Sequence, residues 1–140
     1  MKKTILCLCV LLSALCARAQ HAPQVKPVYM FGFAASFTDS LAYVTDIQRV
    51  DSAYLYKNGF LADRPLYSQQ LADKTEAMGH AHMTCTVFFS TKKAAVEKKY
   101  LKVKRRYGLQ HGVVVTTLPG DEFRFTAVPY LQEMVREVEQ

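Results

Sequence analysis

Two histidines and a cysteine lie close together in the middle of the chain and could bind a metal ion. His80, His82 and Cys85 fall within the short stretch HAHMTC, and His111 follows at the start of a later apolar run. Imidazole and thiolate groups both suit zinc or copper. In an extended chain Cys85 would point to the face opposite His82, so a bend between them would be needed. One hypothesis is therefore a zinc or copper site built from these four residues, and the other is loop histidines beside a core cysteine.

A second candidate is the strongly basic stretch TKKAAVEKKYLKVKRRYG, which spans residues 91–108 and holds eight lysines and arginines beside one glutamate. On a helical wheel Val96, Tyr100, Val103 and Tyr107 fall on one side and form an apolar seam. Five basic residues spread over the opposite side and are called the basic face here: Lys98, Lys99, Lys102, Arg105 and Arg106. The basic face is either the solvated side of an ordinary helix or a binding surface for an anionic partner.

The chemistry of the basic face limits the partners it could have. An anionic surface polymer, a lipid headgroup or an acidic patch on another protein would each complement its charge. Nucleic acid is disfavoured, because Tyr100 and Tyr107 belong to the seam and cannot stack on bases. No groove-entering motif accompanies the basic stretch either.

Motifs of the common enzyme classes are missing from the sequence. There is no G-x-S-x-G, no glycine-rich phosphate loop, no H-E-x-x-H and no dinucleotide fingerprint. Asp39, Asp46 and Asp121 each have an ordinary interpretation as turn formers or solvated strand residues. The sequence therefore favours a non-catalytic protein without a cofactor. The rival class is a metal-binding or hydrolytic protein that uses the histidines with Cys85 or His111.

The first twenty residues have the pattern of an export signal. Two lysines precede an apolar run from Ile5 to Leu15, and Ala17-Arg18-Ala19 supplies the small residues that signal peptidase accepts. The run is about half as long as the roughly 20 residues that a membrane-spanning helix needs. We expect cleavage near Ala19, a mature chain without a transmembrane helix, and a periplasmic or extracellular location. Lipidation at Cys16 is the alternative, which the bulky residue before it disfavours.

Cleavage would change both the cysteine content and the charge. Cys85 would be the one cysteine left, so the mature chain could form no internal disulfide. Of 18 basic residues three would leave, and eight of the rest lie within residues 92–106 beside one acid. The mature chain is therefore polarised in charge: residues 92–106 are strongly positive, and the rest of the mature chain has a net negative charge. Its length suits one domain, so we expect a signal peptide over 1–19, a flexible lead over 20–27 and a single domain over 28–140.

A predicted series of strands and helices must position these groups. Bulky aromatic and small residues alternate over residues 28–37, which predicts an interior strand with another element packed closely over Gly32 and Ala34. A turn at Thr38-Asp39-Ser40 leads to a second strand over 41–48, and the two should form an antiparallel hairpin. Residues 49–61 are irregular in pattern.

The second half of the chain continues with alternating helices and strands. The predicted elements are a helix capped by Asp63 and ended by Gly79, a strand over 83–90, the basic helix from Thr91 to Gly108, a strand over 112–118, a turn over 118–121, a strand over 122–128 and a helix from Pro129 onward. The order ββαβαββα predicts an α+β two-layer sandwich, with a mixed, mostly antiparallel sheet of about five strands and the helices on one face. The strands around Val87 and Val114 should run parallel across the basic helix.

Two stretches, YMFGFAASFTDSLAYVTDIQ and TCTVFFSTKKAAVEKKYLKVK, resemble small exported proteins of unassigned function from Bacteroidetes-type bacteria. The likeness runs from Val28 to Phe125. It implies placement in the cell envelope or outside the cell and carries over no catalytic residues. We therefore expect an exported, non-catalytic binding or accessory protein of the bacterial envelope, in which the basic face is the candidate surface for an anionic partner and a solvated helix face is the alternative.

Overall fold

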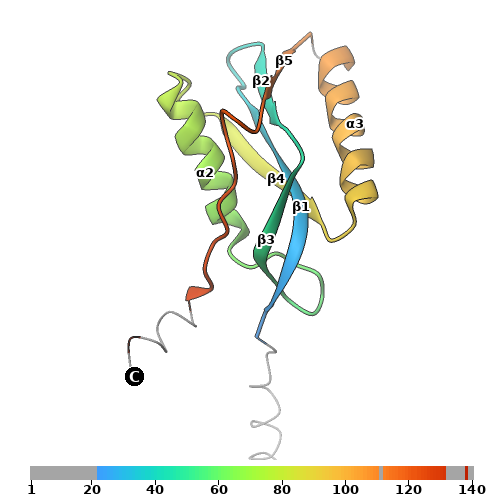
Figure 1. The fold of residues 1–140 in the computed structure, drawn as a ribbon. Helices are drawn as coiled ribbons and strands as arrows, with labels where there is room; N and C mark the ends of the chain where they lie inside the picture. Colours follow the sequence, from blue (N-terminus) through green and yellow to red (C-terminus); the bar gives the residue numbers. More distant parts are fainter. Residues whose placement is uncertain (1–21, 111, 132–137, 139–140) are drawn as a thin grey trace, which may run out of the picture.

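The structure is a computed structural model that describes residues 22–110, 112–131 and 138. These residues form a mixed five-stranded sheet and two helices. The elements are β1 (Gln24–Ala35), β2 (Leu41–Thr45), β3 (Gln48–Leu55), α2 (Arg64–Ala77), β4 (Thr84–Ser90), α3 (Lys93–Gln110) and β5 (Val114–Leu118) (Figure 1). This confirms the predicted α+β class and mixed sheet. The predicted signal peptide, His111 and most of the predicted C-terminal helix lie outside the described residues. Within the described part, no helix is both long and apolar enough to cross a membrane.

Strand β1 is the centre of the sheet. It pairs antiparallel with β4 along one edge, and along the other it pairs with β3 over its first half and with β2 over its end. Strand β5 extends the sheet by pairing parallel with β2. The predicted first hairpin is therefore confirmed. Strands β4 and β5 run in the same direction, as predicted, but β1 and β2 lie between them.

Strand β3 occupies a stretch that the sequence pattern does not identify as a strand. The prediction ended the second strand at residue 48 and treated 49–61 as irregular, whereas residues 48–55 pair with the start of β1. The pairing register shifts between Lys26 and Val28, so the buried positions of β3 do not keep a strict period of two. The same pairing corrects the predicted flexible lead, because β1 already begins at Gln24.

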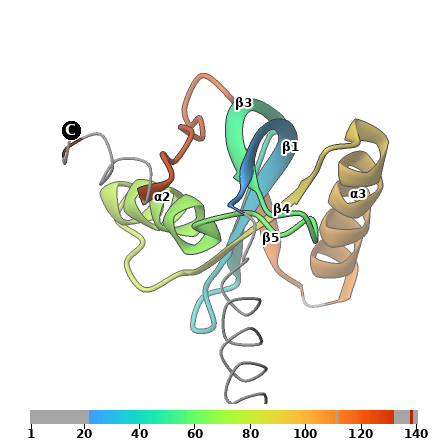
Figure 2. The ribbon, with the colours of Figure 1, turned by 90° about the horizontal axis from the view of Figure 1, so that it is seen from below.

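The two helices lie on opposite faces of the sheet, so the prediction that they share one face is wrong. Tyr67 and Leu71 of α2 pack with Val28 and Met30, whereas α3 packs against the aromatic face of β1. Figure 2 shows the sheet between them. The reason lies in β1, whose small face is as apolar as its aromatic face and is equally buried.

Glycine at position 32 allows α2 to approach β1 closely. A Cβ atom there would lie 2.7 Å from Cδ2 of Leu71 and 2.9 Å from Cζ of Phe125. The predicted close packing over Gly32 is therefore confirmed, and the covering groups come from α2 and from the chain after β5.

The chain after β5 begins with a turn over 119–123 and continues to residue 130 without forming the predicted strand over 122–128. Phe123 and Phe125 are buried, as their alternation indicated. Their backbone is held by the side-chain amide of Gln48, which donates to the Phe123 carbonyl and accepts from the Phe125 N–H, both at 2.8 Å. Gln70 of α2 holds the N–H and carbonyl of Thr126 in the same way. Two glutamine amides therefore replace the neighbouring strand that a ladder would need.

Candidate functional site

Helix α3 is fixed to the sheet by the predicted apolar seam. Val96 and Val103 are only 2% and 7% exposed. The Tyr100 ring meets the Phe31 ring edge-on, with 5.2 Å between centroids, and the Tyr107 ring lies 4.4 Å from that of Phe33. The seam is confirmed, and it fixes which side of α3 faces away from the protein.

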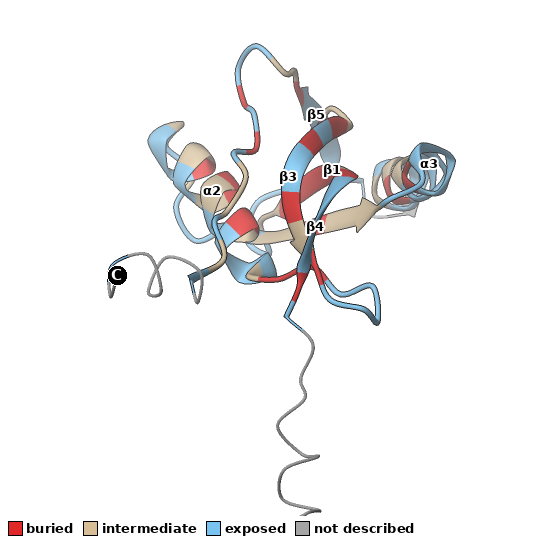
Figure 3. Cartoon of the chain, turned by 60° about the horizontal axis from the view of Figure 1, so that its bottom comes forward, coloured by how far each residue is buried: buried red, intermediate tan, exposed pale blue. Residues whose placement is uncertain are grey.

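The basic face lies on the solvent side of α3, as predicted. All five of its side chains belong to exposed residues, and most of α3 is exposed in Figure 3. Within the described residues none of the five makes an ion pair, since the one acid of the helix, Glu97, faces Lys93 at 3.8 Å. The basic face is therefore an uncompensated cationic surface.

Four of the five basic residues share a shallow hollow with two leucines. This group is called the outer stripe here and consists of Lys98, Leu101, Lys102, Arg105, Arg106 and Leu109. Leu101 and Leu109 are 66% and 79% exposed. The sequence prediction missed both leucines, although the helical wheel places them among the basic residues.

Lys99 is set apart from the other four basic residues. Its Nζ lies 5.4 Å from the centroid of the Phe88 ring, and it lines a different hollow with Arg64. A cation over an aromatic face is stabilised by the ring quadrupole. The structure therefore divides the predicted basic face into an outer group of four and one lysine at its side.

The predicted metal ligands are not gathered into one cluster. His80 is half-buried with its ring 5.6 Å from that of Tyr43, and exposed His82 adopts a left-handed backbone with φ 65° before β4 begins. His111 lies outside the described residues. Among the described residues, no group of three or more histidine, cysteine or acidic side chains could hold a metal ion. The chain turns at Ala81 and His82, and not between His82 and Cys85, where a shared site would need the bend.

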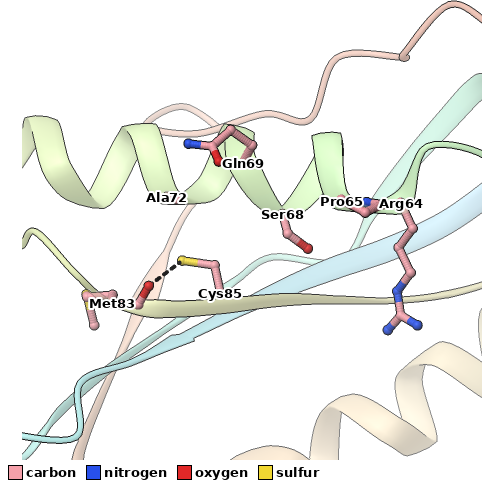
Figure 4. A pocket seen from close by; sticks show the side chains of 7 residues that line it. All are labelled: Arg64, Pro65, Ser68, Gln69, Ala72, Met83 and Cys85. Atoms are coloured by element: carbon pink, nitrogen blue, oxygen red, sulfur yellow. Dashed lines mark hydrogen bonds between the residues drawn. The ribbon is translucent and has the colours of Figure 1, made fainter.

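Cys85 faces an open hollow of about 450 Å³ between α2 and β4 (Figure 4). Its Sγ lies 3.7 Å from the carbonyl oxygen of Met83, to which it donates a weak hydrogen bond. Burial raises the pKa of the Cys85 thiol, and a hydrogen bond with Thr75 opposes this in part. A raised pKa keeps the sulfur protonated, and the thiol is much less nucleophilic than the thiolate. Cys85 is therefore a half-buried, weakly reactive thiol.

This protonation state predicts slow alkylation of Cys85. At neutral pH iodoacetamide should modify folded Cys85 several-fold more slowly than the same residue in urea-unfolded protein, because the thiolate is the reacting form. The difference between the two alkylation rates should become smaller as the pH rises through the raised pKa of Cys85 in the folded protein. Mass spectrometry of the peptide that contains Cys85 measures both rates. Equal rates in folded and unfolded protein at neutral pH would contradict the assignment.

Another concave region lies where the end of β1 meets the C-terminal part of α3. A groove of about 550 Å³ is floored by Phe33 and Ala35 and bordered by Tyr107 and Val113. Its remaining lining is mostly hydroxyl-bearing and comes from the β1–β2 turn and the start of β4: Ser36, Phe37, Thr38, Asp39, Ser40, Thr84 and Thr86. Ser36 already accepts hydrogen bonds from the Thr38 and Asp39 N–H groups, so part of this polar rim serves the turn itself.

Comparisons with protein-family models, with curated proteins and with solved structures give no match for this chain. Of the hollows and surfaces of the described residues, the exposed side of α3 has the clearest preference for one kind of ligand, because its charge is concentrated and uncompensated.

Proposed function

We propose that the protein is an exported, non-catalytic binding protein of the bacterial envelope and that the basic face of α3 binds an anionic partner. The observation that carries the proposal is the combination of five exposed cations, none of them ion-paired within the described residues, on a helix whose opposite side is fixed to the sheet. A fixed helix presents its charges in a constant arrangement. Export is supported by the N-terminal sequence pattern, and placement in the envelope by the resemblance to small exported bacterial proteins.

Repulsion within the basic face supports a binding role. Lys98 and Lys102, and Lys102 and Arg106, are spaced i, i+4 along α3, where like charges destabilise a helix by about 0.2–0.5 kcal/mol per pair. An ordinary solvated helix would intersperse acids among these positions, yet the acids of this chain lie almost entirely elsewhere. An anion bound across the basic face would remove the repulsion and gain the attraction of all the cations at once.

Neutralising part of the basic face tests the proposal. Changing Lys98, Lys102 and Arg105 to glutamine should weaken binding to heparin, used as a soluble polyanion, by about tenfold or more at low ionic strength. The slope of log affinity against log salt should also become shallower, because fewer counterions are released on binding. Titration calorimetry at a series of salt concentrations measures both effects.

A charge-matched variant serves as the control. Lys26, Lys57 and Lys74 lie outside α3, and changing them to glutamine alters the net charge by the same amount. This control should retain most of the affinity for heparin. Equal affinity of the α3 variant and the unmodified protein would refute the proposed binding surface. Equal losses in both variants would mean that only net charge matters and would also refute it.

A further inference from the structure

We propose that the anionic partner of the basic face is a lipid bilayer with negatively charged headgroups, into whose surface Leu101 and Leu109 insert. This inference rests on the proposed function and names the partner at the same surface. The two leucines are among the most exposed large apolar side chains of the described residues, at 66% and 79%. Both lie in the outer stripe, surrounded by cations.

The spacing of the outer stripe suits a flat surface. Leu101 and Leu109 are eight residues apart, so they lie about 80° from each other around α3 and about 12 Å apart along its axis. At the same helical spacing, Lys98 and Arg105 fall between the two leucines around the helix, and Lys102 falls just beside Leu109. The helix therefore presents two apolar side chains within one sector of its surface, with cations between them and beside them.

The leucines distinguish a bilayer from the other anionic partners. A soluble polyanion would contact the cations and leave Leu101 and Leu109 in water, and an acidic protein patch would place carboxylates opposite them. At a bilayer, apolar side chains of a surface helix enter the boundary between headgroups and acyl chains, while lysines and arginines remain at the phosphates. The long aliphatic stems of Lys102 and Arg105 would also lie along the apolar boundary. A bilayer therefore complements both components of the outer stripe.

The position of α3 in the fold leaves the outer stripe accessible to a flat partner. Helix α3 forms one flank of the protein, and its seam side is turned to the sheet while α2 covers the opposite face (Figure 2). No other described element covers the outer stripe, as the exposure of α3 indicates. The protein can therefore lie on a membrane along the length of α3 with the sheet behind it.

Replacing both leucines tests the inference. Leu101→Ser together with Leu109→Ser should reduce affinity for vesicles of phosphatidylcholine and phosphatidylglycerol by about tenfold or more, because insertion of apolar area is lost. Affinity for heparin should stay unchanged, since no cation is removed.

The matched control changes Val25 and Leu66, two exposed apolar residues outside α3, to serine and should keep full vesicle binding. All variants share one N-terminus, so the residues before Ala22 do not differ between them. Vesicle co-sedimentation and thermal melting measure binding and folding.

A fluorescent reporter gives an independent measurement of insertion. The chain contains no tryptophan, so Leu109→Trp introduces a single indole on the outer stripe. Its emission should shift to the blue with phosphatidylglycerol-containing vesicles and stay unshifted with heparin or with phosphatidylcholine alone. Leu66→Trp on α2 is the matched control and should show no shift with any of the three.

The possible outcomes separate the two proposals. Vesicle binding that survives the double leucine change, or a Leu109→Trp emission that does not shift, would overturn the lipid inference while salt-dependent heparin binding still supported the basic face. If the double leucine variant lost affinity for vesicles and for heparin equally, the inference would also be overturned, because the leucines would then not act through lipid. Failure of the Lys98, Lys102 and Arg105 variant to weaken either interaction would refute the proposed function itself.

Discussion

Replacing Gly32 with valine is expected to destabilise the protein by about 3 kcal/mol or more, at or above the upper end of the usual cost of overpacking a core. A Cβ atom alone would approach Leu71 Cδ2 to 2.7 Å and Phe125 Cζ to 2.9 Å, and valine adds two further carbons. Both neighbours are buried, so neither can move aside into solvent. Urea unfolding followed by circular dichroism measures the loss in free energy of unfolding.

Gly108 provides the matched control for this substitution. It lies within α3, its φ is not positive, and a Cβ atom added there would meet no atom within 4 Å apart from its chain neighbours and the backbone of its own helix. Gly108→Val should therefore leave the free energy of unfolding unchanged within about 0.5 kcal/mol, because valine has a slightly better helix propensity than glycine. A Gly32→Val variant as stable as the unmodified protein would mean that α2 does not pack on β1 as described. The combination of Gly32→Ala with Leu71→Ala should cost less than the sum of the single changes, because the two positions share one space.

Replacing Phe31 with alanine is expected to cost about 3–5 kcal/mol, the usual range when a large aromatic side chain is removed from a core. The Phe31 side chain is fully buried, stacks on Phe88 at 4.9 Å between ring centroids and receives the edge of Tyr100. The change also removes the centre of the contact between α3 and the sheet. Urea unfolding gives the free energy, and hydrogen exchange should show weaker protection of α3 amides.

Phe37 is the natural control for Phe31, because it is the same residue type at 90% exposure. Phe37→Ala should change the free energy of unfolding by no more than about 0.5 kcal/mol, as is usual for surface substitutions. If both variants were equally stable, the aromatic face of β1 could not be the support of α3. The proposed binding surface would then lose its fixed geometry as well.

Much of the fold could be predicted from local periodicity. Alternation over residues 28–37 identified β1 as an interior strand, and the seam from Val96 to Tyr107 identified the buried side of α3. Both signals arise because a side chain's direction is set by its own backbone. The face of the sheet on which each helix lies is not a local property. Both faces of β1 are apolar, so the sequence pattern allowed either arrangement.

The other errors in the predicted fold concern β3 and residues 122–128, and they have two physical causes. The register shift near Val28 disrupts the alternation of buried and exposed residues in β3, so the sequence of this strand lacks the period of two that would have identified it. Residues 122–128 kept the alternation of a strand, which indicates extended backbone but does not identify the hydrogen-bonding partner. A side-chain amide such as that of Gln48 can satisfy the same backbone groups.

The candidate site was predicted in part. The five residues of the basic face are exposed as predicted, because a helix with one apolar seam must turn its opposite side to water. The separation of Lys99 could not be predicted, since it depends on Phe88 from another element. Leu101 and Leu109 could have been identified from the helical wheel, where apolar residues on the charged side are the signal.

The way in which residues 119–130 are attached has a consequence for motion. Strands bound in a ladder separate only when the sheet itself is disrupted, whereas this stretch is held largely by the side chains of Gln48, Gln70 and Tyr67. Detachment of this stretch would therefore uncover two phenylalanine rings and leave all five strands paired. Partial opening on the face turned away from α3 would break no strand pairing, and we expect it to cost less free energy than global unfolding.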